Sequence, residues 1–278
     1  MISEKELREG AAAGSIYNET TIADQIHTKW AGKTVHFARE MDSTNLWIKR
    51  LAKEGASEGT LALAEFQSAG RGRLGRSWEV PEGTSVMMSI LLRPEFEPQY
   101  APTLTLVMGM AVAKAVKNLG FDVSIKWPND VVVSHKKICG ILTEMGVRDG
   151  KIDYAVIGVG INVNIKGFPE EMADKATSLY LEAGREFDRS QIPGLVMEAF
   201  EGYYEKFAAT CDLSGLKDEY ESILANYNQP VRVLAKEPYE GIARGITDGG
   251  ELLVEKEDGT IAVVSAGEVS VRGLYSYV

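Results

Sequence analysis

Residues 70–76 read GRGRLGR and lie between two strand-like runs, residues 61–66 and 85–92. Three glycines and three arginines in seven residues favour neither a helix nor a regular strand, because glycine loses more backbone entropy on ordering than any other residue. Arginine is always charged, and its fork of donors matches a carboxylate or a phosphate. The stretch therefore predicts a mobile loop that closes over an anionic small molecule.

Outward from this loop, the spacing of apolar residues predicts helices and closely spaced strands. One helix is capped by Asp42 or Ser43 and stops near Gly55, and a mostly apolar helix covers residues 104–119. Further strands are predicted at residues 123–127, 131–133, 138–145 and 154–163, and further helices at 190–209 and 213–226. Parallel crossovers need about a dozen residues or more, so this spacing favours an antiparallel or mixed sheet.

The pattern changes at Pro230, after which short strand-like runs alternate with turns at Gly249-Gly250 and Asp258-Gly259. The strands are predicted at residues 231–235, 241–247, 252–255, 261–264 and 269–272. These features predict a small all-β module, a barrel. We therefore divide the chain into an N-terminal extension (1–33), a main domain (34–228) and a C-terminal module (229–278).

The composition is that of a globular protein with an acidic surface. The 278 residues are 45% apolar and 25% charged, with a net charge of −10 and a pI near 5.0. This charge argues against a general binder of nucleic acid or anionic membranes. Two cysteines, no signal peptide and no long apolar run favour a cytoplasmic protein without a membrane span.

Five polar segments carry a resemblance to a known family. They are Asp42-Ser43-Thr44-Asn45, Gln67 with the GRGRLGR loop and Trp78, KWPND at residues 126–130, KKICG at 136–140, and GVGIN at 158–162. In this combination and order the chain resembles biotin protein ligases from about Lys33 to its end. The resemblance implies an α+β fold: a mixed-sheet catalytic domain of the biotin/lipoate ligase type and a small C-terminal SH3-like β-barrel.

The resemblance also implies an activity. The enzymes of this family use ATP to activate biotin to biotinyl-5′-AMP and transfer it to a lysine of a biotin carrier domain, which belongs to acetyl-CoA carboxylase or a related carboxylase. ATP with Mg²⁺ is then the expected cofactor and biotin the substrate. A sheet edge is expected to receive the carrier domain by strand pairing, and a homodimer is possible on the same grounds.

The predicted biotin site combines a polar end with a cationic end. Hydroxyl, amide and backbone N–H groups at a helix start suit the ureido head. The residues assigned to biotin by resemblance are Ser43, Thr44, Asn45, Gln67, Gly70, Arg71, Gly72, Arg73, Lys137, Gly140 and Gly160. Simple N-capping is the alternative role for Ser43.

The predicted ATP site shares the cationic end. Its residues are Arg73, Arg76, Trp78, Lys126, Asn129, Lys137 and Asn162, and either asparagine oxygen could bind Mg²⁺. Three residues are assigned catalytic roles: Arg73 and Lys137 stabilise developing charge, and Asp130 orients or deprotonates the acceptor lysine. Alternatively, Trp78 anchors the loop, the asparagines are turn residues, and Asp130 pairs with Lys126 or Lys137. Residues 167–179 are expected to form a second mobile loop that covers the adenine.

Other functions fit the sequence less well. A lipoate or octanoate ligase or transferase needs no ureido-binding cluster at Ser43, Thr44, Asn45 and Gln67. Residues 1–33 lack a basic recognition helix, so we expect no operator-binding activity and disfavour a non-catalytic biotin sensor. An interaction module would leave the arginine loop unexplained. Cys139 follows apolar Ile138 and is interpreted as a buried small hydrophobe, not a nucleophile.

Overall fold

A mixed sheet of seven strands forms the main domain. The computed structural model describes residues 17–266, 270–273 and 277–278. The strand order is β1-β2-β3-β7-β6-β5-β4. The strands are β1 (Val35–Met41), β2 (Leu61–Gln67), β3 (Ser85–Leu92), β4 (Val123–Lys126), β5 (Asp130–Val133), β6 (Lys136–Arg148) and β7 (Lys151–Asn162).

Only β1 and β2 pair in parallel, and every other neighbouring pair in this sheet is antiparallel. A parallel pair needs a long crossover, and the helix between β1 and β2 supplies it. The predicted mixed sheet is confirmed, because short turns join the four strands from β4 to β7 and force antiparallel pairing.

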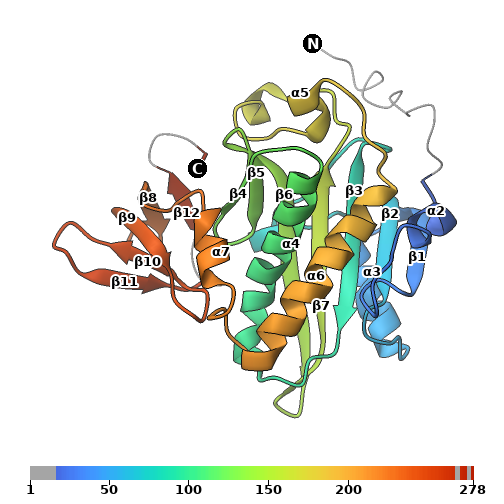
Figure 1. Ribbon diagram of the computed structural model, residues 1–278, viewed down its shortest axis with the longest axis horizontal. Coiled ribbons are helices and arrows are strands. Elements are labelled where there is room, and N and C mark those ends of the chain that lie inside the picture. Colours follow the sequence, from blue (N-terminus) through green and yellow to red (C-terminus); the bar gives the residue numbers. More distant parts are fainter. Residues whose placement is uncertain (1–16, 267–269, 274–276) are drawn as a thin grey trace.

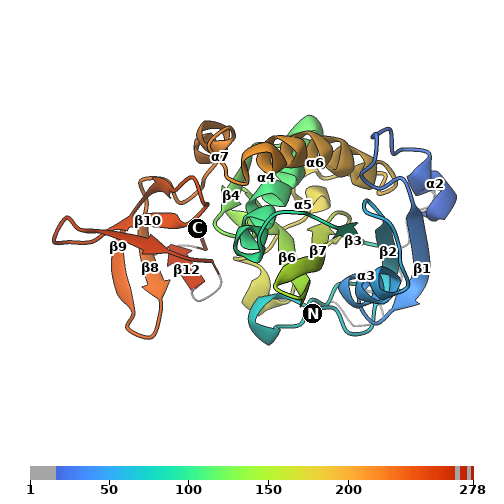
Figure 2. The same cartoon turned by 90° about the horizontal axis from the view of Figure 1, so that it is seen from below.

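Helices cover both faces of this sheet (Figures 1 and 2). The helices α4 (Leu104–Asn118) and α6 (Gln191–Thr210) pack on one face, and α3 (Thr44–Lys53) packs on the other. Most of α4 is apolar and buried, and it joins α6 and the sheet in the main hydrophobic core. A smaller apolar cluster lies under α3 and includes Ile48, Leu91 and Val156. No helix among the described residues has both the length and the apolar character to span a membrane.

The C-terminal module is a separate antiparallel sheet of five strands in the order β11-β10-β9-β8-β12. Its strands are β8 (Pro230–Leu234), β9 (Tyr239–Ile246), β10 (Leu252–Glu255), β11 (Ile261–Val264) and β12 (Ser270–Gly273). This agrees with the predicted small SH3-like module. The boundaries at residues 33/34 and 228/229 stay predictions.

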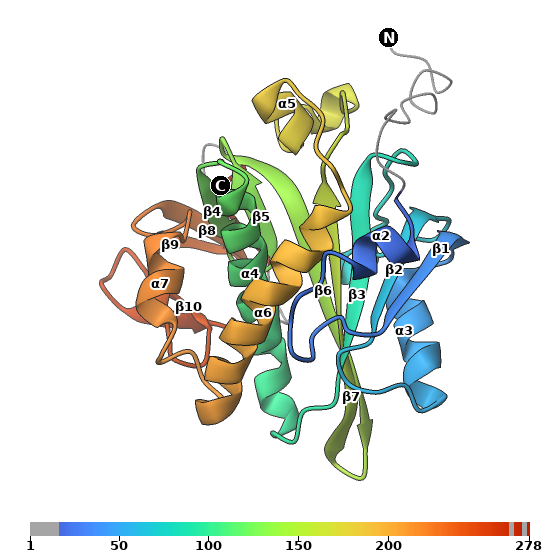
Figure 3. The same cartoon turned by 45° about the vertical axis from the view of Figure 1, so that its right-hand side comes forward.

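Two segments differ from the sequence prediction. The strand β1, which lies beside the short helix α2 (Glu19–Ala23) in Figure 3, was not expected. The predicted helix at residues 213–226 is shorter, since α7 covers only Lys217–Ser222. Beyond it, Ile223 O accepts from Ile125 N and Ala225 N donates to Ile125 O. Pairing with the edge of β4 satisfies these backbone groups, so the chain leaves the helix. A third short helix, α5, covers Leu179–Ala183.

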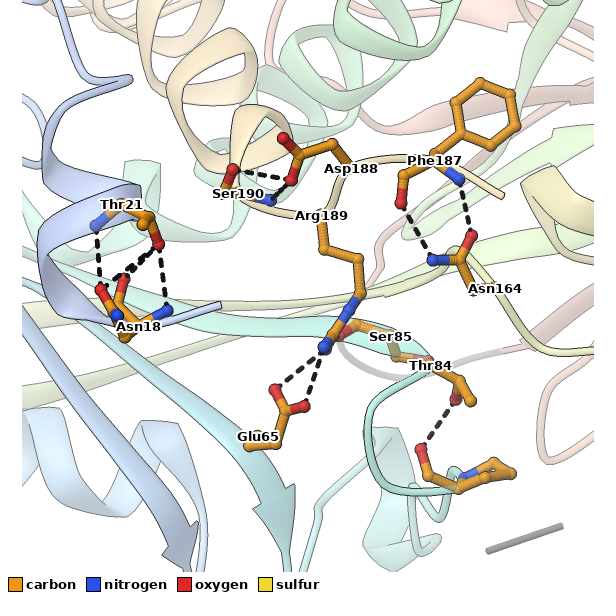
Figure 4. Close-up of polar contacts among 11 residues, drawn as sticks. Asn18, Thr21, Glu65, Thr84, Ser85, Asn164, Phe187, Asp188, Arg189 and Ser190 are labelled. Carbon is orange, nitrogen blue, oxygen red and sulfur yellow. Dashed lines mark hydrogen bonds and ion pairs between the residues drawn. The ribbon is translucent and has the colours of Figure 1, made fainter. Parts of the chain in front are cut away.

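A partly buried ion pair anchors the strand that follows the arginine loop (Figure 4). Arg189 donates to both carboxylate oxygens of Glu65 at 2.8 and 2.9 Å and to Ser85 O at 3.1 Å. Its guanidinium also lies over the ring of Tyr17, 4.2 Å from the centroid. The segment that leads into α6 thereby fixes β2 and the start of β3, the two strands that flank the loop.

Candidate active site

Three glycines on neighbouring strands hollow out the face of the sheet under α3. Gly140 on β6 lies directly opposite Gly160 on β7, and Gly158 is two residues before Gly160 on the same face. A methyl group added at Gly158 would lie 2.0 Å from Asn45 Oδ1, and one at Gly160 would lie 2.7 Å from the indole of Trp78. Only glycine therefore lets these side chains approach the sheet.

A cavity lies over this glycine floor, between α3 and the arginine loop. Its lining contains the predicted residues Ser43, Thr44, Asn45, Gln67, Arg71, Gly72, Arg73, Trp78, Asn129, Lys137, Gly140 and Gly160. Ile141, Leu142, Gly158 and Val159 complete it and were not predicted. Residues from five segments far apart in the sequence thus meet at one place.

The end of the cavity at α3 is a prearranged polar network. Thr44 donates to Gln67 Oε1 from its backbone N at 2.8 Å and from its hydroxyl at 3.2 Å. Ser89 Oγ lies 2.7 Å from Thr44 Oγ1 and 2.6 Å from Asn45 Oδ1, and its one proton can be donated to either. Ser43 occupies the N-cap position of α3, but its side chain makes no capping hydrogen bond. These groups can present donors and acceptors to a polar ring without rearranging.

Glu144 supports this network and was not predicted. Its carboxylate accepts from Asn45 Nδ2 at 2.8 Å and from Lys49 Nζ at 2.7 Å, and Arg71 Nη1 lies 3.4 Å away. Burial raises the pKa of Glu144, but the donors on Lys49 and Asn45 outweigh burial and hold the pKa below its ordinary value. An ionised carboxylate therefore fixes the Asn45 amide and holds the first arginine of the loop.

The arginine loop is folded over the cavity. Its ends pair through Arg71 and Ser77, and Trp78 N donates to Gly70 O at 2.9 Å. The Trp78 indole lies against Gly140 and Gly160, with Lys137 Nζ 5.2 Å from the ring centroid. With this indole in place, the remaining cavity has a volume of about 50 Å³.

The cationic end of the cavity is linked by hydrogen bonds. Arg73 donates to Asn129 Oδ1 at 2.8 Å and to Ala266 O at 2.6 Å. Burial lowers the pKa of Arg73, and the nearby Asp130 carboxylate opposes that effect. Lys137 Nζ lies 2.6 Å from Asp130 Oδ1, so the ion pair considered from the sequence is present, with Lys137 as the partner.

Five predicted residues lie outside the cavity lining: Gly70, Arg76, Lys126, Asp130 and Asn162. Lys126 and Asn162 are buried, whereas Arg76 is exposed. Asn162 lies opposite Ser85, two residues along the same face from Gly160. Asn162 Oδ1 and Ser85 Oγ are both buried without a hydrogen-bond partner, as is Trp78 Nε1. Buried polar atoms are rarely left unpaired, so these three are candidate partners for a polar ligand.

The segment predicted as a second loop packs beside Lys137. Lys137 N donates to Lys175 O at 2.8 Å, and Thr177 N donates to Lys137 O at 2.9 Å. Asn162 Nδ2 donates to Thr177 O at 3.1 Å. Cys139 is fully buried, and burial raises the pKa of its thiol far above the ordinary value, which fits a structural role and not a nucleophile.

The chain matches two known sequence families. Residues 37–162 match the Biotin/lipoate A/B protein ligase family, and residues 227–272 match the Biotin protein ligase C terminal domain. The Bacillus subtilis protein named bifunctional ligase/repressor BirA is 36% identical over 253 residues, which are 90% of this chain and 78% of that protein. The Mycobacterium tuberculosis biotin–[acetyl-CoA-carboxylase] ligase is 30% identical, over 91% of this chain and 94% of its own length.

A solved structure agrees with these sequence matches. The biotin protein ligase from Aquifex aeolicus in complex with biotin and ATP superimposes with a TM-score of 0.75 at 33% identity. The superposition covers 87% of this chain and 99% of the Aquifex chain. The shared length, the fold and the residues brought together over the glycine floor lead to one conclusion: the chain belongs to the biotin protein ligase family.

Proposed function

We propose that this chain is an ATP-dependent biotin ligase that activates biotin to biotinyl-5′-AMP and transfers it to a lysine of a carrier domain. The observation that carries the proposal is the cavity itself. A polar network at α3, an apolar glycine floor and a cationic end lie in the order of biotin's ureido head, ring system and carboxylate. Two comparisons support the proposal. The Mycobacterium relative is named a biotin–[acetyl-CoA-carboxylase] ligase, and the similar Aquifex structure contains biotin and ATP.

Biotin binding requires Trp78 to move. A volume of about 50 Å³ remains over the glycine floor, whereas small-molecule sites enclose roughly 300 Å³ or more. The indole occupies the place where the ring system of biotin would lie on Gly140 and Gly160. In this account biotin displaces the indole, which then covers the bound ligand from the side of the loop.

In the first half-reaction, a carboxylate oxygen of biotin attacks the α-phosphorus of ATP, and pyrophosphate leaves. Both reactants are anionic, so they repel one another unless cations lie between them. Arg73 and Lys137 line the cavity at this end, and Arg71 reaches it from its contact with Glu144 as the loop closes. They neutralise the two reactants and stabilise the charge on the five-coordinate phosphorus. Closure of the loop keeps water from the mixed anhydride.

The nucleotide is assigned to the side of Trp78 where Ser85 Oγ and Asn162 Oδ1 lack hydrogen-bond partners, and these atoms would pair with its polar groups. Lys126 and Arg76 are assigned to the phosphates by their charge alone. Mg²⁺ arrives with ATP and needs few protein ligands. Among the described residues, no cluster of three or more His, Cys, Asp or Glu side chains could hold a metal ion. Asn162 Oδ1 fits as a ligand better than Asn129 Oδ1, to which Arg73 already donates.

In the second half-reaction, the amine nitrogen of the acceptor lysine attacks the acyl carbon and AMP leaves. Asp130 orients the amine and receives its proton, while Lys137 and Asn129 hold the other carboxylate oxygen. The acyl-adenylate is already activated, so no covalent enzyme intermediate is needed.

The acceptor is assigned to the carrier domain of acetyl-CoA carboxylase or a related carboxylase. Its docking edge is the outer half of β6: β5 pairs with residues 136–140, and from Leu142 onward the described strands pair with only one side of β6. Met145 and Val147 are exposed there. The carrier domain, or a second copy of the chain in a homodimer, could add a strand at this edge. A cytoplasmic location stays a prediction based on the two free cysteines.

Exchange of radiolabelled pyrophosphate into ATP tests the proposal. The assay is run with biotin, lipoate, octanoate or no acid. We expect exchange with biotin alone. Exchange with lipoate or octanoate instead would identify the related ligases of the same fold. If no acid supports exchange, the proposal that this chain is an adenylating enzyme is wrong.

A further inference from the structure

The C-terminal module reaches the active site through contacts that no sequence motif indicated. Arg73 donates to Ala266 O, just beyond β11. The Tyr277 hydroxyl donates to Asp130 Oδ2 at 2.5 Å, across 147 residues of sequence. The ring of Tyr277 lies 3.4 Å from Lys126 Nζ, measured to the centroid. One aromatic side chain therefore contacts both charged residues of the KWPND segment.

The two oxygens of Asp130 are held from different sides. Oδ1 accepts from Lys137 Nζ at 2.6 Å and from Asn129 Nδ2 at 3.1 Å. Oδ2 accepts from Tyr277. A carboxylate offers about four lone-pair positions, and these three donors leave one at Oδ2 for a further donor. Donors on both oxygens fix the plane of the carboxylate. They therefore also fix the direction of the one lone pair of Oδ2 that has no donor.

We propose that Tyr277 is a positioning residue for acyl transfer, which holds Asp130 Oδ2 so that its remaining lone pair faces the incoming lysine amine. The inference rests on the proposed function, since Asp130 needs this orientation only if an amine attacks here. The ring has a second role: it covers the ammonium group of Lys126, which is buried. The C-terminal module thereby takes a direct part in the second half-reaction.

The variant Tyr277→Phe separates the hydroxyl from the ring. Transfer is measured with preformed biotinyl-5′-AMP and a carrier domain, and adenylation by pyrophosphate exchange. We expect kcat of transfer to fall about tenfold, because a hydrogen bond to a charged group is lost. We expect the KM for the carrier and the rate of pyrophosphate exchange to change by less than about twofold. A purely structural role would slow both half-reactions.

Tyr239→Phe is the matched control. Tyr239 belongs to β9 of the same module, and Lys256 Nζ lies 4.9 Å from its ring centroid. None of the residues lining the described cavity comes from β9. We expect this variant to carry out both half-reactions at the wild-type rate.

A double mutant tests whether Tyr277 acts through Asp130. In the Asp130→Asn background, Tyr277→Phe should slow transfer by less than about twofold further, because the two residues act as one unit. Wild-type transfer by Tyr277→Phe, equal slowing of both half-reactions, or an additive loss in the double mutant would each overturn the inference. Failure of the proposed function would appear separately, as a wild-type chain without biotin-dependent pyrophosphate exchange.

Discussion

Substitution of Gly158 by alanine tests how the glycine floor serves biotin. The new methyl group would lie 2.0 Å from Asn45 Oδ1 and 2.9 Å from Asn45 Cγ. Carbon–oxygen contacts below 3.0 Å essentially never occur at a real Cβ, so the amide must retreat by about 1 Å. Such a shift lengthens the 2.6 Å hydrogen bond from Ser89 to about 3.6 Å, which no longer counts as a hydrogen bond.

The magnitude follows from the contacts of Asn45. Its amide accepts from Ser89 and donates to the Glu144 carboxylate and to Leu142 O. Losing one neutral hydrogen bond and one to a charged group costs about 3 kcal/mol in total. If that whole cost falls on the biotin complex, the Kd for biotin rises roughly 100-fold, because about 1.4 kcal/mol corresponds to a factor of ten.

The assay is isothermal titration with biotin, together with the KM for ATP in pyrophosphate exchange. We expect the Kd for biotin to rise between about tenfold and 100-fold, and the KM for ATP to change by less than about threefold. Gly202→Ala on α6 is the control, since nothing lies within 4 Å of the added methyl group. In an Asn45→Ala background, which removes the clash, Gly158→Ala should add little. If the Gly158→Ala protein binds biotin with the wild-type Kd, then biotin binding does not depend on the close approach of Asn45 to Gly158.

Three further predictions concern Lys137, the Arg189–Glu65 ion pair and the buried carboxylate of Glu201. Lys137→Ala should slow adenylate formation by about 100-fold or more, with an unchanged circular dichroism spectrum, because one preorganised cation is lost; wild-type turnover would contradict this role. Arg189→Met should lower the free energy of unfolding by about 2 kcal/mol in denaturant titrations, because it leaves the partly buried Glu65 carboxylate unpaired, and adding Glu65→Leu should restore most of it. Burial raises the pKa of Glu201, but three backbone N–H donors lower it below its ordinary value of 4.5. The stabilisation by Glu201 should therefore be complete above about pH 4.5 and be lost as the pH falls further, so melting temperatures of wild type and Glu201→Gln should converge only in acid.

The sequence predicted the regular elements where hydrophobic periodicity was strong. β3 begins and ends at the predicted residues, Ser85 and Leu92. The strand β1 was missed because its residues His36, Arg39 and Glu40 give it no apolar run. The end of the predicted helix after Ser222 depends on pairing with β4. No local signal reveals such a long-range partner.

The sequence motifs predicted most of the residues that line the candidate site. They did not predict Glu144 and Tyr277, which hold predicted site residues in place. Glu144 is 99 residues from Asn45 in the sequence, and Tyr277 is 147 residues from Asp130. Such contacts follow from sheet order and not from local pattern. Glu144 had one available signal: Gly140, Leu142 and Glu144 alternate along one strand and so share a face. The sequence did not decide whether Trp78 binds ATP or anchors the loop, because the position of its side chain depends on how the loop folds.

We propose that the arginine loop holds two repelling anions together over the glycine floor. A crystal structure of the chain with biotin and ATP would show whether it does. We expect Arg71 and Arg73 within hydrogen-bond distance of the biotin carboxylate or the α-phosphate, with the Trp78 indole displaced from Gly160. A structure in which biotin and ATP are bound while residues 70–76 point into solvent and touch neither would contradict it.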